Sequence, residues 1–418
     1  MYLKPFLYVL LWGWLFNSSS AQSEEIPAVD HVDLISIDTA LSLSDLVNQT
    51  LEKYPDYALV AAMQQESEAL HARGRSWISG APQLQTYYKD DFAGTGTGAY
   101  EFDGSIQVPV WNWGQRDAGL QLAEQAANNT NQQGQAIKLK VAGLVREVLW
   151  SLKLEGLRYD TAKKELALAE RLLATVQRRV ALGDLPKSDL LLAKNRALQK
   201  RAALIQQEAA VMHTRKRYYF LTQTDKVPEQ VVEVKSTITT INETHPALAA
   251  INSKIAKQKA KMEWIRAQGS GKTTIAIGGV TERGARTDSA INSMVFAVNI
   301  PFGGQAFLAP KIAIANRSYV AAKAEKAHLY RALLARLHEA EHTLGVELEQ
   351  STLAQQMQLN AQERLKMADL SFSSGEINLT DFLITQTQAY RAINNARESR
   401  IRLQRDIAFY NQAVGVMP

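Results

Sequence analysis

Two long stretches of helical periodicity restrict the fold of this chain more than any other feature of its sequence. Residues 118–180 contain no proline, and residues 310–374 contain none after Pro310. At 1.5 Å per residue, a helix of such length spans about 95 Å. Apolar residues recur in both stretches at three- and four-residue spacing, which is typical of helices packed side by side. The sequence therefore predicts long parallel rods, with local kinks where glycines interrupt them.

The two stretches belong to a plan that the chain carries twice. A turn that begins at Gly183 has a counterpart that begins at Gly375, and 375 − 183 = 192. The same offset relates Pro109 to Pro301, since 301 − 109 = 192. Matching anchors at one offset predict two structural repeats. We assign residues 22–233 to the first repeat and residues 234–418 to the second.

Each repeat is predicted to contain an opening helix, two short strands, a long helix, a tight turn and a return helix. In the first repeat the opening helix covers residues 56–77 and the return helix covers residues 188–221. Laid end to end, these two helices nearly match the long one, so one repeat builds two rods and two repeats build four. Four rods cannot enclose a core of this length, so association with further chains is implied.

Alternation of apolar and polar residues predicts the strands. The strand pair of the first repeat lies within residues 82–110, and that of the second lies within residues 272–302. The last predicted strand places five apolar residues on one face: Met294, Phe296, Val298, Ile300 and Phe302. Strands of about 10 residues cross an outer membrane when tilted. A sheet with one wet face in a soluble protein is the alternative. Four strands cannot close a barrel, and open edges are not tolerated in lipid, so a barrel requires several chains.

The N-terminus has the pattern of a secretory signal peptide. Lys4 precedes an apolar run over residues 6–16, and small residues lead to Ala21. The run is about half the ~20 residues that a spanning helix needs. We therefore predict a signal peptide over residues 1–21 and an exported mature protein.

Composition excludes several classes of function. The chain has no cysteine and seven scattered histidines, so a zinc or cysteine enzyme is not expected. Its net charge is +5, and basic and acidic residues alternate along the helices, which argues against nucleic-acid binding. A glycine-rich segment at residues 269–273 lacks the first glycine of a phosphate-binding loop, because Arg266 stands there. We expect no catalytic residue, cofactor or resident metal.

The duplication, the segment over residues 108–116 and the two turns with a Gly-x-x-x-x-[Ser/Thr]-Asp pattern resemble the TolC family of outer-membrane efflux proteins. The resemblance implies an α+β membrane protein, with a long α-helical coiled-coil barrel and a transmembrane β-barrel to which each protomer gives four strands. It also implies a homotrimer. Residues 75–82 are similar to the heavy-metal, cobalt–zinc–cadmium type branch of that family.

The resemblance assigns roles to the two turns. The family's adaptor-contacting tip corresponds to Gly183, Asp184, Leu185, Pro186 and Ser188 in the first repeat, and to Gly375, Glu376, Ile377, Asn378 and Thr380 in the second. Asp189 and Asp381 correspond to its acidic pore constriction. The aromatic-and-basic latch of some members is absent, since Phe372 and Ile377 occupy those places. A local alternative is that Ser188 and Thr380 cap the return helices and the two acids favour the helix dipole.

The implied function is that of a passive exit duct in a tripartite efflux pump. Its partners would be a periplasmic adaptor protein, an inner-membrane transporter of the resistance-nodulation-division type and outer-membrane lipid. It would lie in the Gram-negative outer membrane and extend into the periplasm. Heavy-metal cations are one open substrate class. The alternative is an exported, soluble coiled-coil scaffolding protein without channel activity.

Overall fold

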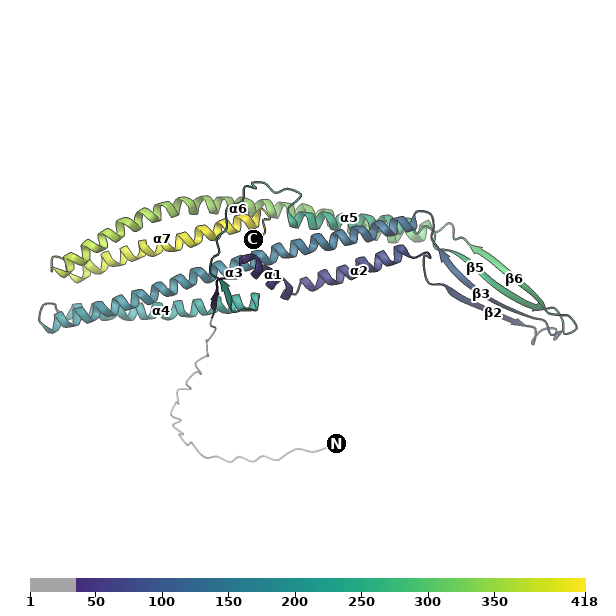
Figure 1. Ribbon diagram of the computed structural model, residues 1–418, viewed down its shortest axis with the longest axis horizontal. Coiled ribbons are helices and arrows are strands. Elements are labelled where there is room, and N and C mark those ends of the chain that lie inside the picture. The colour runs from purple at the N-terminus through teal and green to yellow at the C-terminus, as the bar shows by residue number, and fades with distance from the viewer. Residues whose placement is uncertain (1–34) are drawn as a thin grey trace, which may run out of the picture.

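The computed structural model describes residues 35–418 and is strongly elongated (Figure 1). Long helices run along its axis, and a four-stranded sheet forms one end. The predicted signal peptide, residues 1–21, lies outside the described residues. Within residues 35–418, no helix combines the length and the apolar character needed to cross a membrane.

The order helix–strand–strand–helix–helix occurs twice, as the plan predicted. The first set comprises α2 (Tyr57–Arg75), β2 (Gln83–Asp90), β3 (Tyr100–Val110), α3 (Gln115–Ala181) and α4 (Lys187–Thr222). The second set comprises α5 (Pro246–Ala267), β5 (Thr273–Arg283), β6 (Ile291–Asn299), α6 (Gln305–Ser373) and α7 (Leu379–Ala413). Three short elements were not predicted: β1 (Ser36–Asp38), α1 (Leu43–Lys53) and β4 (Lys226–Pro228).

Both long helices exist and are slightly longer than predicted, at 67 residues for α3 and 69 for α6. Pro310 was expected at the start of the second, but α6 begins at Gln305 and holds the proline inside it. A proline within a helix removes one backbone hydrogen bond. The surrounding turns of α6 tolerate that loss because it falls close to the helix end.

The helices form four parallel rods. The long helix α3 packs against α2 and α4 on one side and against α5 and α7 on the other, and α6 packs against α5 and α7. In Figure 1, α2 and α4 lie along one line, and α5 and α7 lie along another. The order across the bundle is therefore α2/α4, α3, α5/α7, α6. Within residues 35–418, the first and last rods each have one side without a packed neighbour.

The sheet has the strand order β2-β3-β5-β6, and all neighbours are antiparallel. The central β3–β5 pair joins the two sets of elements, with Tyr100 opposite Arg283 and Val110 opposite Thr273. The predicted extension of β6 to Phe302 was wrong, because the strand ends at Asn299. Pro301 has no N–H for a ladder bond, and Gly303 turns the chain at φ +74°.

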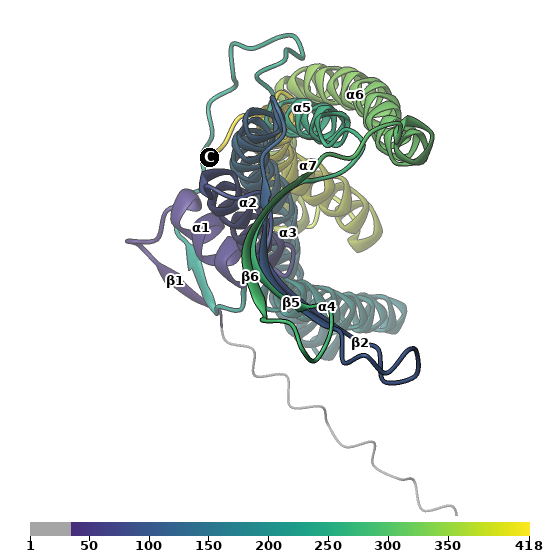
Figure 2. The same ribbon diagram turned by 90° about the vertical axis from the view of Figure 1, so that its right-hand side faces the viewer.

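The largest buried apolar cluster lies midway along the rods (Figure 1), where α1 and the β1–β4 pair lie beside the bundle (Figure 2). Arg146 of α3 is fully buried there. Its guanidinium binds both carboxylate oxygens of Glu233, at 2.6 and 2.9 Å, and donates to Gln412 at 2.6 Å. One side chain thus joins α3, the segment between the two sets of elements, and the end of α7.

Candidate functional site

The two predicted turns lie together at the end of the rods opposite the sheet (Figure 1). Gly183 and Gly375 adopt left-handed conformations, with φ of +85° and +81°. After each glycine an N–H bonds back across the helix end, from Asp184 to Arg179 and from Glu376 to Ser371, both at 2.8 Å. Glycine is required here, because a left-handed residue closes both helices.

The local alternative, in which Ser188 and Thr380 cap the return helices, is wrong. Ser188 and Thr380 do not cap them, because α4 begins at Lys187 and α7 at Leu379, which places both hydroxyl residues inside the first turn. Asn378 caps α7, and its side-chain oxygen accepts from the Asp381 N–H at 2.9 Å. Pro186 holds the cap position of α4 and makes no side-chain cap bond.

The predicted constriction acids occupy equivalent first-turn positions but different surroundings. The Asp381 carboxylate is exposed and accepts from the Asn378 amide at 2.9 Å. Asp189 is half-buried, and its backbone N–H donates to the Pro186 carbonyl at 3.1 Å. Both carboxylates therefore lie beside the tips, where α4 and α7 start.

An apolar cluster beneath the tips holds the two helical hairpins together. The rings of Phe372 and Phe382 stack, with centroids 4.7 Å apart and an interplanar angle of 11°. They pack in one cluster with Val176 of α3 and Ala193 of α4. The Arg179 guanidinium of α3 lies 5.5 Å from the Phe372 centroid, within cation–π range. From the sequence, Phe372 was identified only as a departure from the family's aromatic-and-basic latch, and its stacking was not predicted.

Polar contacts continue this association along the rods. Arg158 of α3 pairs with Glu398 of α7 at 2.7 Å, and Glu165 of α3 accepts from Asn394 at 2.8 Å. The hydrogen bond from Glu398 raises the pKa of Arg158, against the opposing effect of burial. Arg196 of α4 also donates to the Thr387 hydroxyl, at 2.7 Å. The hairpins therefore meet along several turns.

One face of the sheet carries a bare apolar row that crosses every strand. The register aligns Leu84 with Ile106, Ile106 with Ile277, and Ile277 with Phe296. These four side chains are 74%, 55%, 56% and 67% exposed. On the opposite face of the sheet, Gln85 and Gln107 are joined by a side-chain hydrogen bond. In the part of the chain that the structure describes, the sheet thus has one apolar surface without a packed partner and one polar surface.

Exposed aromatic residues mark both ends of this sheet. Trp77, Trp113 and Phe302 lie where the strands join the helices and are 78%, 102% and 92% exposed. Phe92 and Tyr88 lie at the loop end and are 89% and 62% exposed. The apolar band is thus bordered by aromatic side chains at each edge.

Elongated rods joined to a sheet with a bare apolar face are the architecture of outer-membrane channels of the TolC type, and comparison with solved structures shows that this chain has that fold. The Campylobacter jejuni CmeC outer membrane channel matches with a TM-score of 0.69 and 14% identity, over 89% of this chain and 85% of that one. The outer membrane protein VceC of Vibrio cholerae matches with a TM-score of 0.68 and 12% identity, over 90% and 97%.

The open state of the MtrE outer membrane channel of Neisseria gonorrhoeae matches with a TM-score of 0.65 and 12% identity, over 90% of this chain and 89% of that one. No family model and no curated protein matches the sequence. The resemblance seen in the sequence is thus confirmed for the fold, and at these identities the likeness rests on architecture alone.

Proposed function

We propose that this chain is the outer-membrane channel component of a tripartite efflux pump. Three copies would close a twelve-stranded β-barrel and a continuous helical duct that reaches into the periplasm. The duct conducts solutes passively and catalyses no reaction. The observation that carries this proposal is the bare apolar row across all four strands.

The sheet has the properties that lipid requires. A row such as Leu84–Ile106–Ile277–Phe296 would leave water when it faces hydrocarbon, and each such side chain contributes about 1.5–3 kcal/mol on full burial. Aromatic residues at the two edges suit the two membrane interfaces. The opposite, polar face would line the aqueous lumen.

The sheet cannot enter a membrane alone. Its outer strands, β2 and β6, each have one unpaired edge among the described residues. Unpaired backbone groups in hydrocarbon cost several kcal/mol each. Pairing β2 of one copy with β6 of the next removes every edge when the ring closes, which supports an oligomer over the soluble scaffold.

The tips are the proposed contact for a periplasmic adaptor, and an inner-membrane transporter of the resistance-nodulation-division type would supply the energy. Gly183–Ser188 and Gly375–Thr380 form the end of the molecule farthest from the sheet, as such a contact requires (Figure 1). We place the pore constriction at Asp189 and Asp381. Heavy-metal cations are a proposed substrate class, motivated by residues 75–82.

Membrane fractionation tests the proposal against the scaffold. The channel predicts heat-modifiable trimers in the outer-membrane fraction, whereas the scaffold predicts soluble monomers in the periplasm. Recovery of soluble monomers would overturn the channel. Conductance of the purified protein in a planar bilayer then tests the constriction: Asp381→Asn should raise ion leak and reduce cation selectivity, and an unchanged conductance would leave Asp381 with its local contact to Asn378 only.

A further inference from the structure

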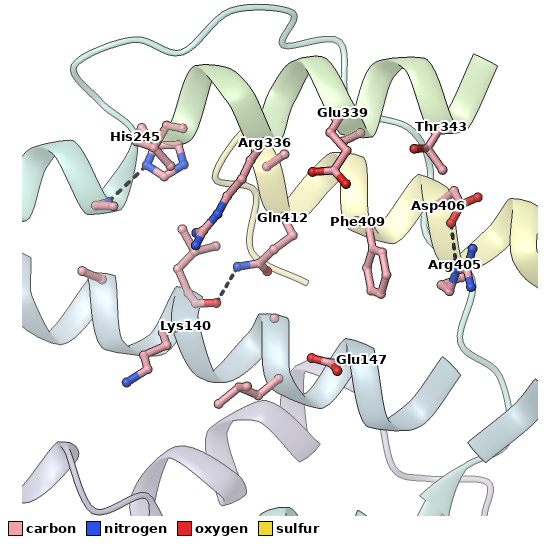
Figure 3. A pocket seen from close by; sticks show the side chains of 18 of the residues that line it. Lys140, Glu147, His245, Arg336, Glu339, Thr343, Arg405, Asp406, Phe409 and Gln412 are labelled. Atoms are coloured by element: carbon pink, nitrogen blue, oxygen red, sulfur yellow. Dashed lines mark hydrogen bonds and ion pairs between the residues drawn. The ribbon is translucent and has the colours of Figure 1, made fainter. Parts of the chain in front are cut away.

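The third rod is interrupted, and a cavity occupies the interruption. Helix α7 ends at Ala413 and α5 begins at Pro246, and a cavity of about 790 Å³ lies beside this break, between α3 and α6 (Figure 3). All its lining residues belong to this one chain, and it is open to solvent where Arg336, Glu339 and Thr343 of α6 are exposed. Its volume falls within the range of small-molecule pockets, about 300–1,000 Å³.

Two buried polar atoms at the cavity have no hydrogen-bond partner within residues 35–418: His245 Nε2 and Asp406 Oδ2. Both side chains line the cavity, and both residues are only 3% exposed. Asp406 uses its other oxygen, Oδ1, to accept from Arg405 at 2.8 Å. His245 Nδ1 accepts from the Ala247 N–H at 3.2 Å, so the neutral ring carries its proton on Nε2. Leaving the acceptor Asp406 Oδ2 unpaired costs free energy that a donor group on a ligand would recover.

Three basic and three acidic side chains line the cavity, and ion pairs already occupy two of the basic ones. Lys140 is compensated by Asp56 at 2.8 Å, and Arg405 by Asp406 at the same distance. Glu147 of α3 and Glu339 of α6 point toward the cavity from opposite walls (Figure 3). Neither has an ion-pair partner in the described part of the chain, and the same holds for the guanidinium of Arg336. Two uncompensated carboxylates thus face one guanidinium.

Apolar surface completes the cavity. Leu139 and Leu144 contribute from α3, Leu329 and Leu333 from α6, and Phe409 from α7. Phe409 already has one cation near its ring, because the Arg405 guanidinium lies 5.8 Å from the centroid. A ligand that fills the cavity would bury this apolar lining and shield the carboxylates from water. Shielding strengthens their attraction for a positive charge.

We propose that this cavity binds an organic cation that carries a primary amine on a small apolar or aromatic body. The ammonium group donates to Asp406 Oδ2 and is attracted by Glu147 and Glu339, while the body packs against Phe409 and the leucines. The proposal does not depend on the channel function, because the cavity lies within one protomer.

Isothermal titration calorimetry of the full-length protein, purified from membranes in detergent, tests this site. Tryptamine is the cationic probe, and tryptophol is its matched neutral control, since a hydroxyl replaces the ammonium group. We expect saturable binding of tryptamine to the wild-type protein and binding of tryptophol at least about tenfold weaker. Absence of saturable tryptamine binding, or equal binding of the two probes, would overturn the proposal.

Substitutions at the cavity test whether tryptamine binds there. Asp406→Asn and, separately, the double substitution Glu147→Gln with Glu339→Gln should each weaken tryptamine binding about tenfold or more. The double variant alters exposed carboxylates only, so it keeps the test valid if Asp406→Asn fails to fold. Glu349→Gln, at an exposed position of α6 away from the cavity, should leave binding unchanged. Equal losses in all three variants, or no loss in the first two, would contradict the assignment.

Discussion

Helices α3 and α6 occupy equivalent places in the two halves of the molecule and have nearly equal lengths, yet their surfaces differ. No large hydrophobic side chain of α3, all of whose residues are described, is exposed, whereas α6 exposes twelve. The exposed large hydrophobic side chains of α6 are Phe307, Ile314, Val320, Tyr330, Leu334, Val346, Leu348, Leu353, Met357, Leu359, Met367 and Leu370.

The difference follows from the order of the rods. Helix α3 has a neighbouring rod on each side, and α6 has one on a single side. At the other edge of the bundle, α4 also exposes apolar residues, including Leu198 and Ile205. The comparison teaches that the inner rods are covered on both sides within residues 35–418, whereas each edge rod leaves apolar side chains exposed. These exposed faces support the proposed oligomer.

The largest expected effect concerns the buried charge on α3. Arg146→Ala leaves Glu233 buried without its cation, and removing one partner of such a pair costs about 3–5 kcal/mol. The residue 192 positions later is His338 on α6, which is exposed, so His338→Ala should change stability by less than about 0.5 kcal/mol. Urea denaturation of both variants measures the contrast. Similar losses of stability in the two variants would show that these positions of α3 and α6 are equally buried.

A charge on the bare face of α6 should prevent assembly while sparing the protomer fold. Leu353 is 59% exposed in the single chain, and Leu353→Glu would bury a carboxylate in the proposed interface, at a cost of several kcal/mol. Size-exclusion chromatography with light scattering should report monomers with unchanged helical circular dichroism. Gln355→Glu, which introduces the same charge at an exposed polar position about 200° around the helix from Leu353, is the control. Intact oligomers of the Leu353 variant would refute an α6 interface.

The glycines at the tips should respond oppositely to a glycine within α6. Gly183→Ala and Gly375→Ala force a side chain into a left-handed conformation, at about 1–2 kcal/mol each. Gly345→Ala, inside α6 with open space around its Cβ position, should stabilise by about 0.5–1 kcal/mol. Thermal unfolding compares the three variants, and a neutral result at both tips would contradict the turn geometry.

The two return helices should differ in their dependence on side-chain caps. Asn378→Ala removes the bond to the Asp381 N–H and should cost about 1 kcal/mol. Pro186 makes no side-chain cap bond, so Pro186→Ala removes no such bond from α4 and does not carry its cost in stability. Amide hydrogen exchange in the first turns of α7 and α4 measures the effect locally. Faster exchange in α4 of the Asn378 variant would show that the effect is not local.

The smallest expected effect is a pH dependence of folding stability that arises from His245, at the start of α5. Burial lowers the pKa of His245 below its ordinary value, so the unfolded chain binds a proton more readily than the folded one. The folded state therefore loses stability as the pH falls through the unfolded value of about 6.5. His245→Gln should flatten the dependence of the urea midpoint on pH in this region. An unchanged profile would exclude His245 as its source.

Local signals in the sequence predicted much of the fold. The limits of β3 follow from strict alternation, and the tips follow from Gly183 and Gly375. The start of α6 was missed because Pro310 is a helix breaker by propensity, yet the helix tolerates it close to its N-terminal end. The contacts of Arg146 could not be predicted from the sequence, because Glu233 and Gln412 lie 87 and 266 positions away along the chain. The bare face of α6 appears only when burial is known.

Disulfide cross-linking tests the central claim most directly, because the natural chain has no cysteine. Ile205 lies 18 residues from the start of α4 at Lys187, and Leu353 lies 20 residues from the end of α6 at Ser373, so both are at a similar height above the tips. Oxidation of the variant with Ile205→Cys and Leu353→Cys should give covalent dimers and trimers, and each single variant should give no trimers. Exclusively single-chain species from the double variant in membranes would contradict the account.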